Sequence, residues 1–184
     1  MSELDQLIPL LLARSVRHGD FVLASGRHSE YYIDARLTTM SAQGLALIGR
    51  IGLAAIRAAG WAPQAIGGLT MGADPVAYAI ATASATNPPL LDAFSVRKEA
   101  KGHGTKRRIE GNFVPGAGVV VVEDVITSGG SALQAIRAVE EEGGRVLGVL
   151  AVVDREEGGR AAILAAGHGV VSLTTTTSLG LKNS

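Results

Sequence analysis

The sequence predicts an α/β fold in which a mostly parallel central sheet carries helices on both faces. Strand-like and helix-like segments alternate along the 184 residues, a length that suits a single domain over residues 1–184. The strands are continuous apolar runs rather than alternating patterns, and the four valines at 119–122 form the most apolar one. Such runs are typical of parallel sheets whose two faces are both buried.

The N-terminal region predicts a helix followed by a short pair of strands. Apolar residues between positions 4 and 12 follow helical spacing, and Pro9 falls inside the pattern, where it kinks the helix or marks a late start. His18-Gly19 is expected to end this segment. Phe21–Leu23 and Tyr31–Ile33 then predict two short strands joined by a longer loop.

The rest of the chain alternates between strands and helices. Ser41 is the expected N-cap of a long Ala-, Leu- and Ile-rich helix that stops at Gly60. The expected strands are Ala65–Leu69, Leu90–Val96, Val119–Val122, Arg145–Val153 and Val170–Leu173. The later helices are expected at about Asp74–Ala85, from the turn at 127–131 to about Glu142, and at Ala161–Ala166. Arg97–Glu110 is charged, punctuated by glycine and aperiodic, so we expect a mobile loop there.

The composition argues against several classes of function. Basic and acidic residues balance at 17 each, which is not expected of a chain dominated by nucleic-acid binding. The chain has no cysteine, so disulfides, thiolate catalysis and sulfur-based zinc sites are excluded, and we expect a cytoplasmic location. The N-terminus lacks the features of a signal peptide, and its apolar run is too short to span a bilayer, so no membrane partner is expected.

Two adjacent acids after the most apolar strand predict a site for a phosphorylated sugar. The turn Thr127–Ser131 follows them and offers backbone N–H groups and a helix N-terminus to a phosphate. Glu123 and Asp124 offer acceptors to ribose hydroxyls or to a hydrated metal ion. The turn alone is more typical of an ordinary N-capped β–α turn, but adjacent buried acids are costly unless a ligand or cation compensates them. No Walker loop or dinucleotide fingerprint occurs.

Other loops are expected at the same edge of the sheet, where open α/β folds bind ligands. The small-residue turn within Gly67–Gly72 could expose N–H groups to a pyrophosphate, although a simple tight turn is equally consistent with it. Arg97–Glu110 could be a solvated charged loop, a nucleic-acid patch or a lid over a polyanion; glycines on both sides of His103 favour the lid. Tyr31 and Tyr32 could stack on a flat ring or pack in the core.

Val119–Ser131 resembles the phosphoribosyl-diphosphate motif of type I phosphoribosyltransferases, which is an apolar strand, two acids, two apolar residues and a Thr/Ser/Gly loop. The segments Phe21–Arg36, Val96–Gly111 and Val152–Gly159 narrow the resemblance to the orotate phosphoribosyltransferase family. It extends from about residue 10 to about residue 179. It implies a small N-terminal hood over about residues 1–40 and a mobile active-site loop over about residues 97–110.

The resemblance also implies a role for each candidate site residue. Glu123 and Asp124 would hold the ribose hydroxyls, and the 5′-phosphate would lie in the loop of Thr127, Ser128, Gly129, Gly130 and Ser131. The pyrophosphate would meet Thr70, Met71, Gly72, Arg97, Lys98, Lys101 and His103, and the orotate would lie among Ser25, Arg27, Tyr31, Tyr32 and Arg155. Lys101, His103 and Asp124 are the residues that we assign to the reaction itself.

The implied reaction transfers the phosphoribosyl group of phosphoribosyl diphosphate to orotate, and it gives orotidine 5′-monophosphate and pyrophosphate in pyrimidine biosynthesis. Mg²⁺ would be carried mainly by the diphosphate, with no direct protein ligand, and the enzyme would be a homodimer that shares its mobile loop between subunits. Two departures from the family pattern are Ala24 and Met71, where many members carry lysine. Without these two lysines, the contacts to the anion would fall to backbone N–H groups and to the mobile loop.

Two other functions remain open from the sequence. One is transfer to another base, such as uracil, xanthine or adenine, against which the Ser-Gly-Arg and Lys-x-His segments argue. The other is a non-catalytic regulator that senses phosphoribosyl diphosphate. The balanced charge and the intact basic loop favour an enzyme.

Overall fold

The computed structural model describes residues 2–22, 28–99 and 108–181, and its centre is a six-stranded sheet in the order β5-β4-β3-β6-β7-β8. These strands are β3 (Ala65–Leu69), β4 (Asp92–Val96), β5 (Ile109–Gly111), β6 (Gly118–Ile126), β7 (Arg145–Asp154) and β8 (Val170–Thr175). All neighbours pair in parallel except β4 and β5, which pair antiparallel at one edge. The predicted α/β class with a mostly parallel sheet is confirmed.

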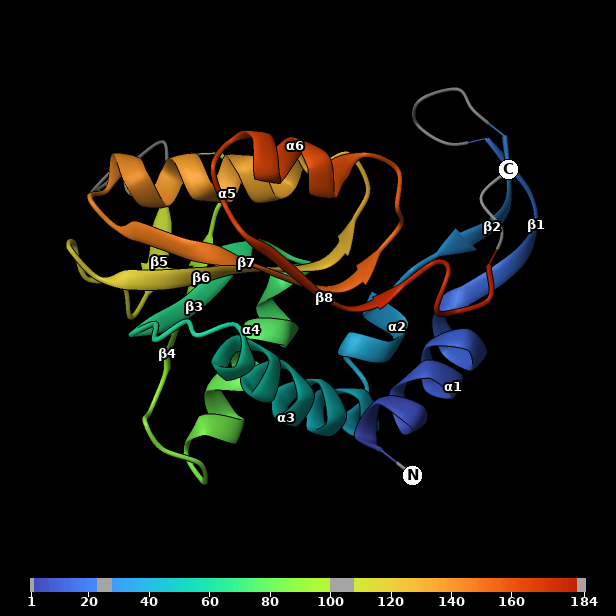
Figure 1. The fold of residues 1–184 in the computed structure, drawn as a ribbon, viewed down its shortest axis with the longest axis horizontal. Helices are drawn as coiled ribbons and strands as arrows, with labels where there is room; N and C mark the ends of the chain where they lie inside the picture. Colours follow the sequence, from blue (N-terminus) through green and yellow to red (C-terminus); the bar gives the residue numbers. More distant parts are fainter. Residues whose placement is uncertain (1, 23–27, 100–107, 182–184) are drawn as a thin grey trace.

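Helices cover both faces of this sheet (Figure 1). Helices α3 (Ala42–Ala58) and α4 (Ala73–Ser84) lie on one face, and α5 (Gly130–Glu141) and α6 (Gly159–Ala165) lie on the other. Alternate residues of β6 enter different cores: Val120 and Val122 pack with α3 and α4, whereas Val119 and Val121 pack with α5 and α6. A strand whose two faces are both buried reads as a continuous apolar run, which explains its four valines.

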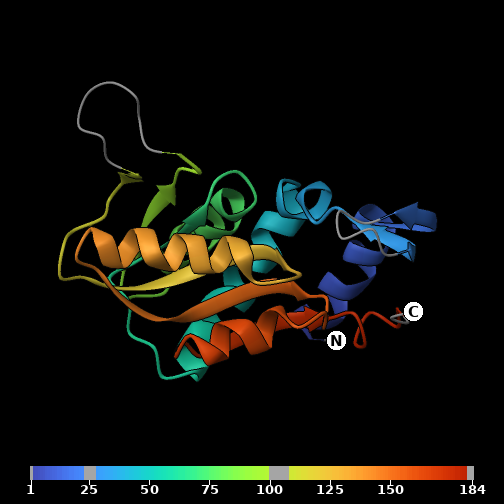
Figure 2. The same cartoon turned by 90° about the horizontal axis from the view of Figure 1, so that it is seen from above.

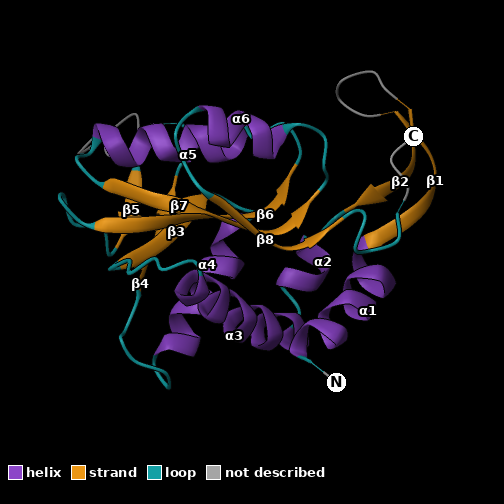
Figure 3. Cartoon of the chain, in the orientation of Figure 1, coloured by secondary structure: helices purple, strands orange, loops and turns teal. Residues whose placement is uncertain are grey.

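The N-terminal region adds a helix and a two-stranded sheet, and its residues Leu7, Leu11, Tyr31 and Ile33 are buried in the same core as α3 and α4. Helix α1 (Glu3–Ser15) leads into β1 (Val16–Val22), which pairs antiparallel with β2 (His28–Ile33), and a short helix α2 (Arg36–Thr39) follows. Figures 2 and 3 place this two-stranded sheet apart from the central sheet, beyond the carboxyl ends of β6 and β7. It therefore stands beside the edge at which the parallel strands end.

Several expected boundaries were wrong. Helix α1 passes through Pro9 and ends at Ser15, so His18-Gly19 does not close the helix but lies within β1. The pairing of β1 with β2 draws this segment into a strand, with an irregularity between His18 and Phe21. Strand β6 does not stop at Val122, because its ladder with β7 continues to Ile126. Glu123 and Asp124 are thus inside the strand rather than just beyond it.

Two short elements, α2 and β5, were not expected at all. Strand β5 includes Ile109 and Glu110, so the end of the expected loop Arg97–Glu110 is an edge strand paired with β4. Residues 100–107 of that loop lie outside the described residues. Among the helices that the structure describes, none is long and apolar enough to cross a membrane.

Candidate functional site

An open pocket of about 410 Å³ lies at the carboxyl ends of the parallel strands and beside the N-terminal unit. Ten of the residues predicted for the site line it: Tyr32, Thr70, Met71, Gly72, Lys98, Glu123, Asp124, Thr127, Ser131 and Arg155. A smaller pocket of about 80 Å³ is lined by Glu123 and by the residues from Val125 to Ala132. The two share Glu123, Val125, Thr127 and Ser131, so they are adjoining parts of one site.

Glu123 and Asp124 are neighbours on β6, and their side chains therefore leave opposite faces of the strand. Glu123 is only 6% exposed and lines both pockets. Its Oε1 atom is buried and has no hydrogen-bond partner among the described residues. Burial, followed by the charge of Asp124, raises the pKa of the Glu123 carboxyl from 4.5 to about 8. At neutral pH this carboxyl is therefore mostly protonated.

Asp124 lies against the turn that follows β3. The Val125 N–H donates to Asp124 Oδ1 at 2.8 Å, and a Cβ atom added to Gly72 would lie 2.6–2.8 Å from the carboxylate of Asp124. Burial raises the pKa of Asp124, while the Val125 hydrogen bond and the positive charge of Arg36 oppose the rise. Glycine at position 72 is what allows the acid and the turn to approach each other.

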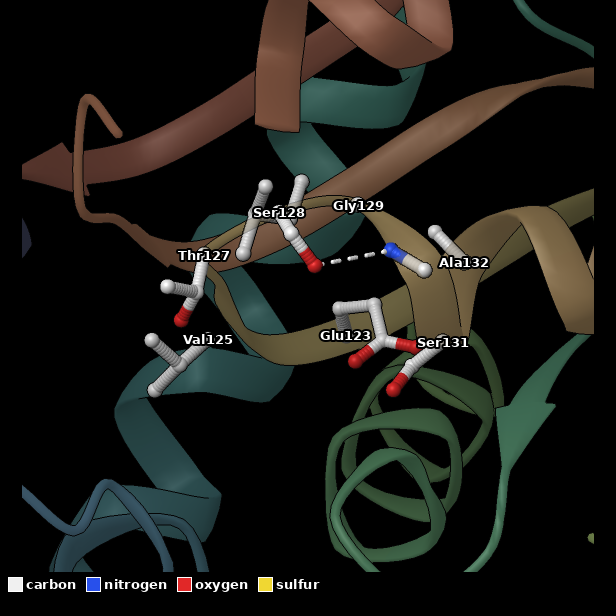
Figure 4. A pocket seen from close by; sticks show the side chains of 9 residues that line it. Glu123, Val125, Thr127, Ser128, Gly129, Ser131 and Ala132 are labelled. Carbon is white, nitrogen blue, oxygen red and sulfur yellow. Dashed lines mark hydrogen bonds between the residues drawn. The ribbon is translucent and has the colours of Figure 1, made fainter. Parts of the chain in front are cut away.

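The predicted phosphate loop connects β6 to the N-terminus of α5. Gly129 has φ +81° and is the N-cap residue of α5, a left-handed conformation that glycine adopts readily. The Thr127 carbonyl accepts a 2.9 Å hydrogen bond from the Gly159 N–H, which ties the loop to the start of α6. Figure 4 shows Glu123, Thr127, Ser128 and Ser131 around this loop, together with the contact between Ser128 Oγ and the Gly130 N–H. Hydroxyl groups and a helix N-terminus make it suitable for an anion.

The turn after β3 is held firmly beneath the larger pocket. The Thr70 N–H donates to the Val96 carbonyl at 2.8 Å, and the Thr70 hydroxyl donates to Asp74 Oδ2 at 2.7 Å. The peptide bond between Thr70 and Met71 is cis. Met71 is 61% exposed and lines the pocket.

The residues predicted to bind the base fall into two groups. Tyr32 is 40% exposed and lines the pocket, whereas Tyr31 is 3% exposed and belongs to the core. The guanidinium of Arg155 lies 5.4 Å from the Tyr31 ring centroid and pairs with Glu157 Oε1 at 2.7 Å. Arg155 therefore faces the pocket from a buried position that Tyr31 and Glu157 fix. Ser25 and Arg27, also predicted here, lie outside the described residues, as does Ala24.

The first residues of the predicted loop point in different directions. Arg97 pairs with Glu110 across the β4–β5 ladder, with an Nε–Oε1 distance of 2.9 Å, and it is not among the residues that line the pocket. Lys98 does line the pocket, and its carbonyl accepts a hydrogen bond from Gln134 of α5. The predicted catalytic residues Lys101 and His103 lie outside the described residues.

Sequence reasoning missed an ion pair at the pocket wall. Arg36 Nε and Nη2 donate to the two carboxylate oxygens of Asp34 at 2.8 and 3.0 Å, and both residues line the larger pocket. The hydrogen bond from Arg36 is the main reason why the pKa of Asp34 is lowered. The signal was present in the Tyr-Tyr-Ile-Asp-Ala-Arg run, but only the fold brings this pair toward Asp124.

The chain matches a known protein family and several curated proteins over most of its length. Residues 40–163 match the phosphoribosyl transferase domain family. An orotate phosphoribosyltransferase of Rhodopirellula baltica is 44% identical over 98% of this chain and 95% of its own length. One of Mycobacterium avium is 48% identical over 97% of both chains.

Solved structures are also similar to this chain over nearly its whole length. A crystal structure of Mycobacterium tuberculosis orotate phosphoribosyltransferase in complex with Fe(III) dicitrate matches with a TM-score of 0.87 and 46% identity, over 98% of this chain and 100% of that one. A structure of the same enzyme with 5-phospho-α-D-ribosyl 1-diphosphate matches with a TM-score of 0.83 and 42% identity, over 98% and 100%.

Proposed function

This chain belongs to the phosphoribosyltransferase family, and we propose that it is an orotate phosphoribosyltransferase of pyrimidine biosynthesis. It transfers the phosphoribosyl group of 5-phosphoribosyl 1-diphosphate to orotate, and the products are orotidine 5′-monophosphate and diphosphate. The observation that carries the proposal is identity of 44–48% to orotate phosphoribosyltransferases over nearly the whole chain. The pocket at the sheet edge, with its acids, phosphate loop and arginines, supports it.

The donor lies across the two adjoining pockets in this proposal. Its 5′-phosphate occupies the small pocket at Thr127–Ser131, where hydroxyls and the α5 N-terminus favour an anion. The ribose hydroxyls meet Asp124 and Glu123. Because Glu123 holds a proton at neutral pH, it can donate one hydrogen bond to a ribose hydroxyl as well as accept one.

The diphosphate end lies over the turn Thr70–Gly72 with Lys98 near it, and Lys101 and His103 of the loop contact it. Arg97 pairs with Glu110 and does not line this pocket, so we assign it no contact with the diphosphate here. We include Arg36 with the residues at the diphosphate, because its guanidinium lines the same pocket and is oriented by Asp34. The residues present fit a Mg²⁺ ion that the diphosphate carries, since the Asp124 carboxylate lines the pocket and would accept a hydrogen bond from a water on such an ion, whereas Glu123 is mostly protonated. The ion would neutralise part of the charge on the leaving group.

Orotate lies between Tyr32 and Arg155, with Ser25 and Arg27 on the neighbouring loop. A ring nitrogen attacks the anomeric carbon, a C–N bond forms, the C–O bond to diphosphate breaks, and the electron pair leaves with diphosphate. The carbon passes through a cationic state, so catalysis depends on positioning and on stabilising the leaving group. Asp124 holds the sugar through this step, and Lys101 and His103 stabilise the departing diphosphate.

A substrate panel tests the proposal directly. Purified protein with Mg²⁺ and phosphoribosyl diphosphate should convert orotate, and it should not convert uracil, xanthine or adenine at a comparable rate. Loss of turnover on chelation of Mg²⁺ is expected, with recovery on its return. Binding of the donor without product from any base would instead indicate a regulator.

The assembly and the location are part of the same proposal. The enzyme works as a homodimer in the cytoplasm, with the loop at about residues 97–110 acting across the subunit boundary, and it needs neither nucleic acid nor membrane. Light scattering of the purified protein tests the dimer. Mixing an inactive Lys101→Ala protomer with an inactive Asp124→Asn protomer tests loop sharing, because a mixed dimer would regain one intact site.

A further inference from the structure

The carboxylate of Asp74 accepts hydrogen bonds on both of its oxygens from the two chain segments that flank the predicted diphosphate site. Thr70 Oγ1 donates to Oδ2 at 2.7 Å, and Ser95 Oγ donates to Oδ1 at 2.6 Å. We infer that Asp74 is a positioning residue, which holds the turn Thr70–Gly72 in the geometry that receives diphosphate. The inference rests on the proposed function, in which this turn contacts the diphosphate.

Asp74 does not itself suit a ligand contact. It is not among the residues that line the larger pocket, and each of its carboxylate oxygens already accepts a hydrogen bond from a hydroxyl group. A negative charge beside a diphosphate would also repel it. Any contribution to the reaction must therefore pass through the groups that Asp74 holds.

The hydrogen bond from Thr70 to Asp74 limits which donor groups of the turn can bind an anion. A hydroxyl has a single proton, and that of Thr70 is committed to Asp74. The Thr70 N–H is also committed, to the Val96 carbonyl at 2.8 Å. Recognition of diphosphate at this turn therefore falls to the backbone N–H groups of Met71 and Gly72. Such groups bind an anion well only when the backbone is held in the correct orientation.

The bond from Ser95 connects the turn to β4. Ser95 pairs with Gly68 in the β3–β4 register, and its hydroxyl also lies 2.9 Å from the Tyr78 hydroxyl on α4. Since Ser95 donates to Asp74, Tyr78 is the donor in this second contact. Strand β4 ends at Val96, two residues before Lys98, which lines the pocket. Asp74 thus connects the turn to β4, the strand that leads into Lys98.

Steady-state kinetics of Asp74→Ala, Asp74→Asn and Ser95→Ala test this role. For Asp74→Ala, we expect the KM for phosphoribosyl diphosphate to rise about tenfold, in line with the loss of hydrogen bonds to a charged group. The KM for orotate at saturating donor should change less than about twofold, because Asp74 holds nothing on the base side. Asp74→Asn keeps one acceptor oxygen and should be intermediate. Asp92→Asn, an exposed acid at the start of β4, is the matched control and should behave as wild type.

Measuring diphosphate binding directly distinguishes a loss of the turn's geometry from a general loss of folding. Calorimetry with Mg²⁺ and inorganic diphosphate should show the same order of weakening, and thermal unfolding should show whether each variant is folded. Asp74 lies in the first turn of α4, where its negative charge also interacts favourably with the helix dipole. If its role were purely structural, the substitutions would lower the unfolding temperature and change the two KM values equally.

Equal changes in the two KM values, or unchanged diphosphate affinity in folded Asp74→Asn and Ser95→Ala, would overturn the inference. A wild-type protein that fails to convert orotate would overturn the proposed function instead. The diphosphate titration would still decide whether Asp74 positions the turn.

Discussion

The carboxylate of Asp124 occupies the space into which a side chain at Gly72 would project, so the acid that we propose for the ribose is in direct contact with the turn that we propose for the diphosphate. Gly72 has φ −65° and ψ −39°, a conformation that any residue adopts, and the need for glycine there is purely steric. In the proposed function, the ribose and the diphosphate of the donor are therefore bound by groups that cannot move independently.

Gly72→Ala should consequently lower both activity and stability. The new Cβ would lie 2.6–2.8 Å from three atoms of the Asp124 carboxyl, so the acid or the turn must shift. We expect the KM for phosphoribosyl diphosphate to rise and the free energy of unfolding to fall by about 1–3 kcal/mol. In an Asp124→Ala background the same substitution should cost little stability, and a double-mutant cycle in urea measures that coupling. Additive effects would show that the contact is not the cause.

The pH dependence of stability should reveal the proton on Glu123. The pKa of its carboxyl is about 8 in the folded protein and 4.5 in its usual state, so the folded protein holds the proton between these values. The free energy of unfolding should therefore fall as pH rises from about 5 to about 8, with a slope approaching 1.4 kcal/mol per pH unit at most. Below pH 4.5 this contribution is fully present.

Glu123→Gln removes the titrating group and keeps the shape of the side chain. Urea denaturation at pH 5 through pH 9 should show a flatter profile for Glu123→Gln than for wild type. Parallel profiles for the two proteins would mean that Glu123 is ionised in the folded state. The substitution should also weaken donor binding most at high pH, where the wild-type carboxylate is the better acceptor.

The sheet was predictable from the sequence because its strands are buried on both faces. Val119–Val122 is apolar on both sides for that reason, and the same argument identified β3, β4, β7 and β8. Strand β5 was missed because three residues, two of them exposed, carry no periodic signal. His18-Gly19 was misjudged because glycine after a helical pattern resembles a helix end, while the pairing with β2 is a tertiary effect.

The candidate site was predictable where one segment carries both the residues and their geometry. Thr127–Ser131 has its turn, glycines and helix start in consecutive positions, and it lines a pocket as a unit. The pair of Asp34 with Arg36 and the pair of Asp74 with Ser95 could not be predicted as part of the site from the sequence. Hydrogen bonds that form only in the fold orient both pairs. Tyr31 and Tyr32 show the limit most clearly, since adjacent strand residues face opposite sides and only Tyr32 lines the pocket.

Gly129→Ala should damage the phosphate loop more than its backbone strain alone would. The φ of +81° costs a non-glycine residue about 1–2 kcal/mol, and the new Cβ would also lie 2.8 Å from the Gly159 carbonyl oxygen. Gly158 has φ +92° with nothing within 4 Å of such a Cβ, so Gly158→Ala is a matched control for strain without the clash. Gly129→Ala should unfold at lower urea than Gly158→Ala and bind inorganic phosphate more weakly. Equal midpoints would contradict the clash.

Arg36→Gln should weaken binding of the donor more than binding of orotate. Arg36 lines the pocket, Asp34 fixes its guanidinium through two hydrogen bonds, and its charge lowers the pKa of Asp124. We expect about a fivefold to tenfold rise in the KM for phosphoribosyl diphosphate, comparable to the loss of one charge-assisted hydrogen bond. Asp34→Asn, which keeps Arg36 but loosens it, should give a smaller rise. A larger effect on orotate would place Arg36 on the base side of the pocket.

Lys101→Ala should lower kcat far more than it changes the affinity for orotate. A cation that reaches the diphosphate as it leaves stabilises charge that develops in the transition state, and losing one such donor typically costs on the order of 3 kcal/mol, or about a hundredfold in rate. Lys98→Ala is the informative comparison, because Lys98 lines the pocket at the end of β4 and should affect the KM for the donor as well. Single-turnover measurements with saturating substrates isolate the chemical step from product release. An unchanged single-turnover rate for Lys101→Ala would remove this residue from the reaction and leave Lys98 and Arg36 as the cations that serve the leaving group.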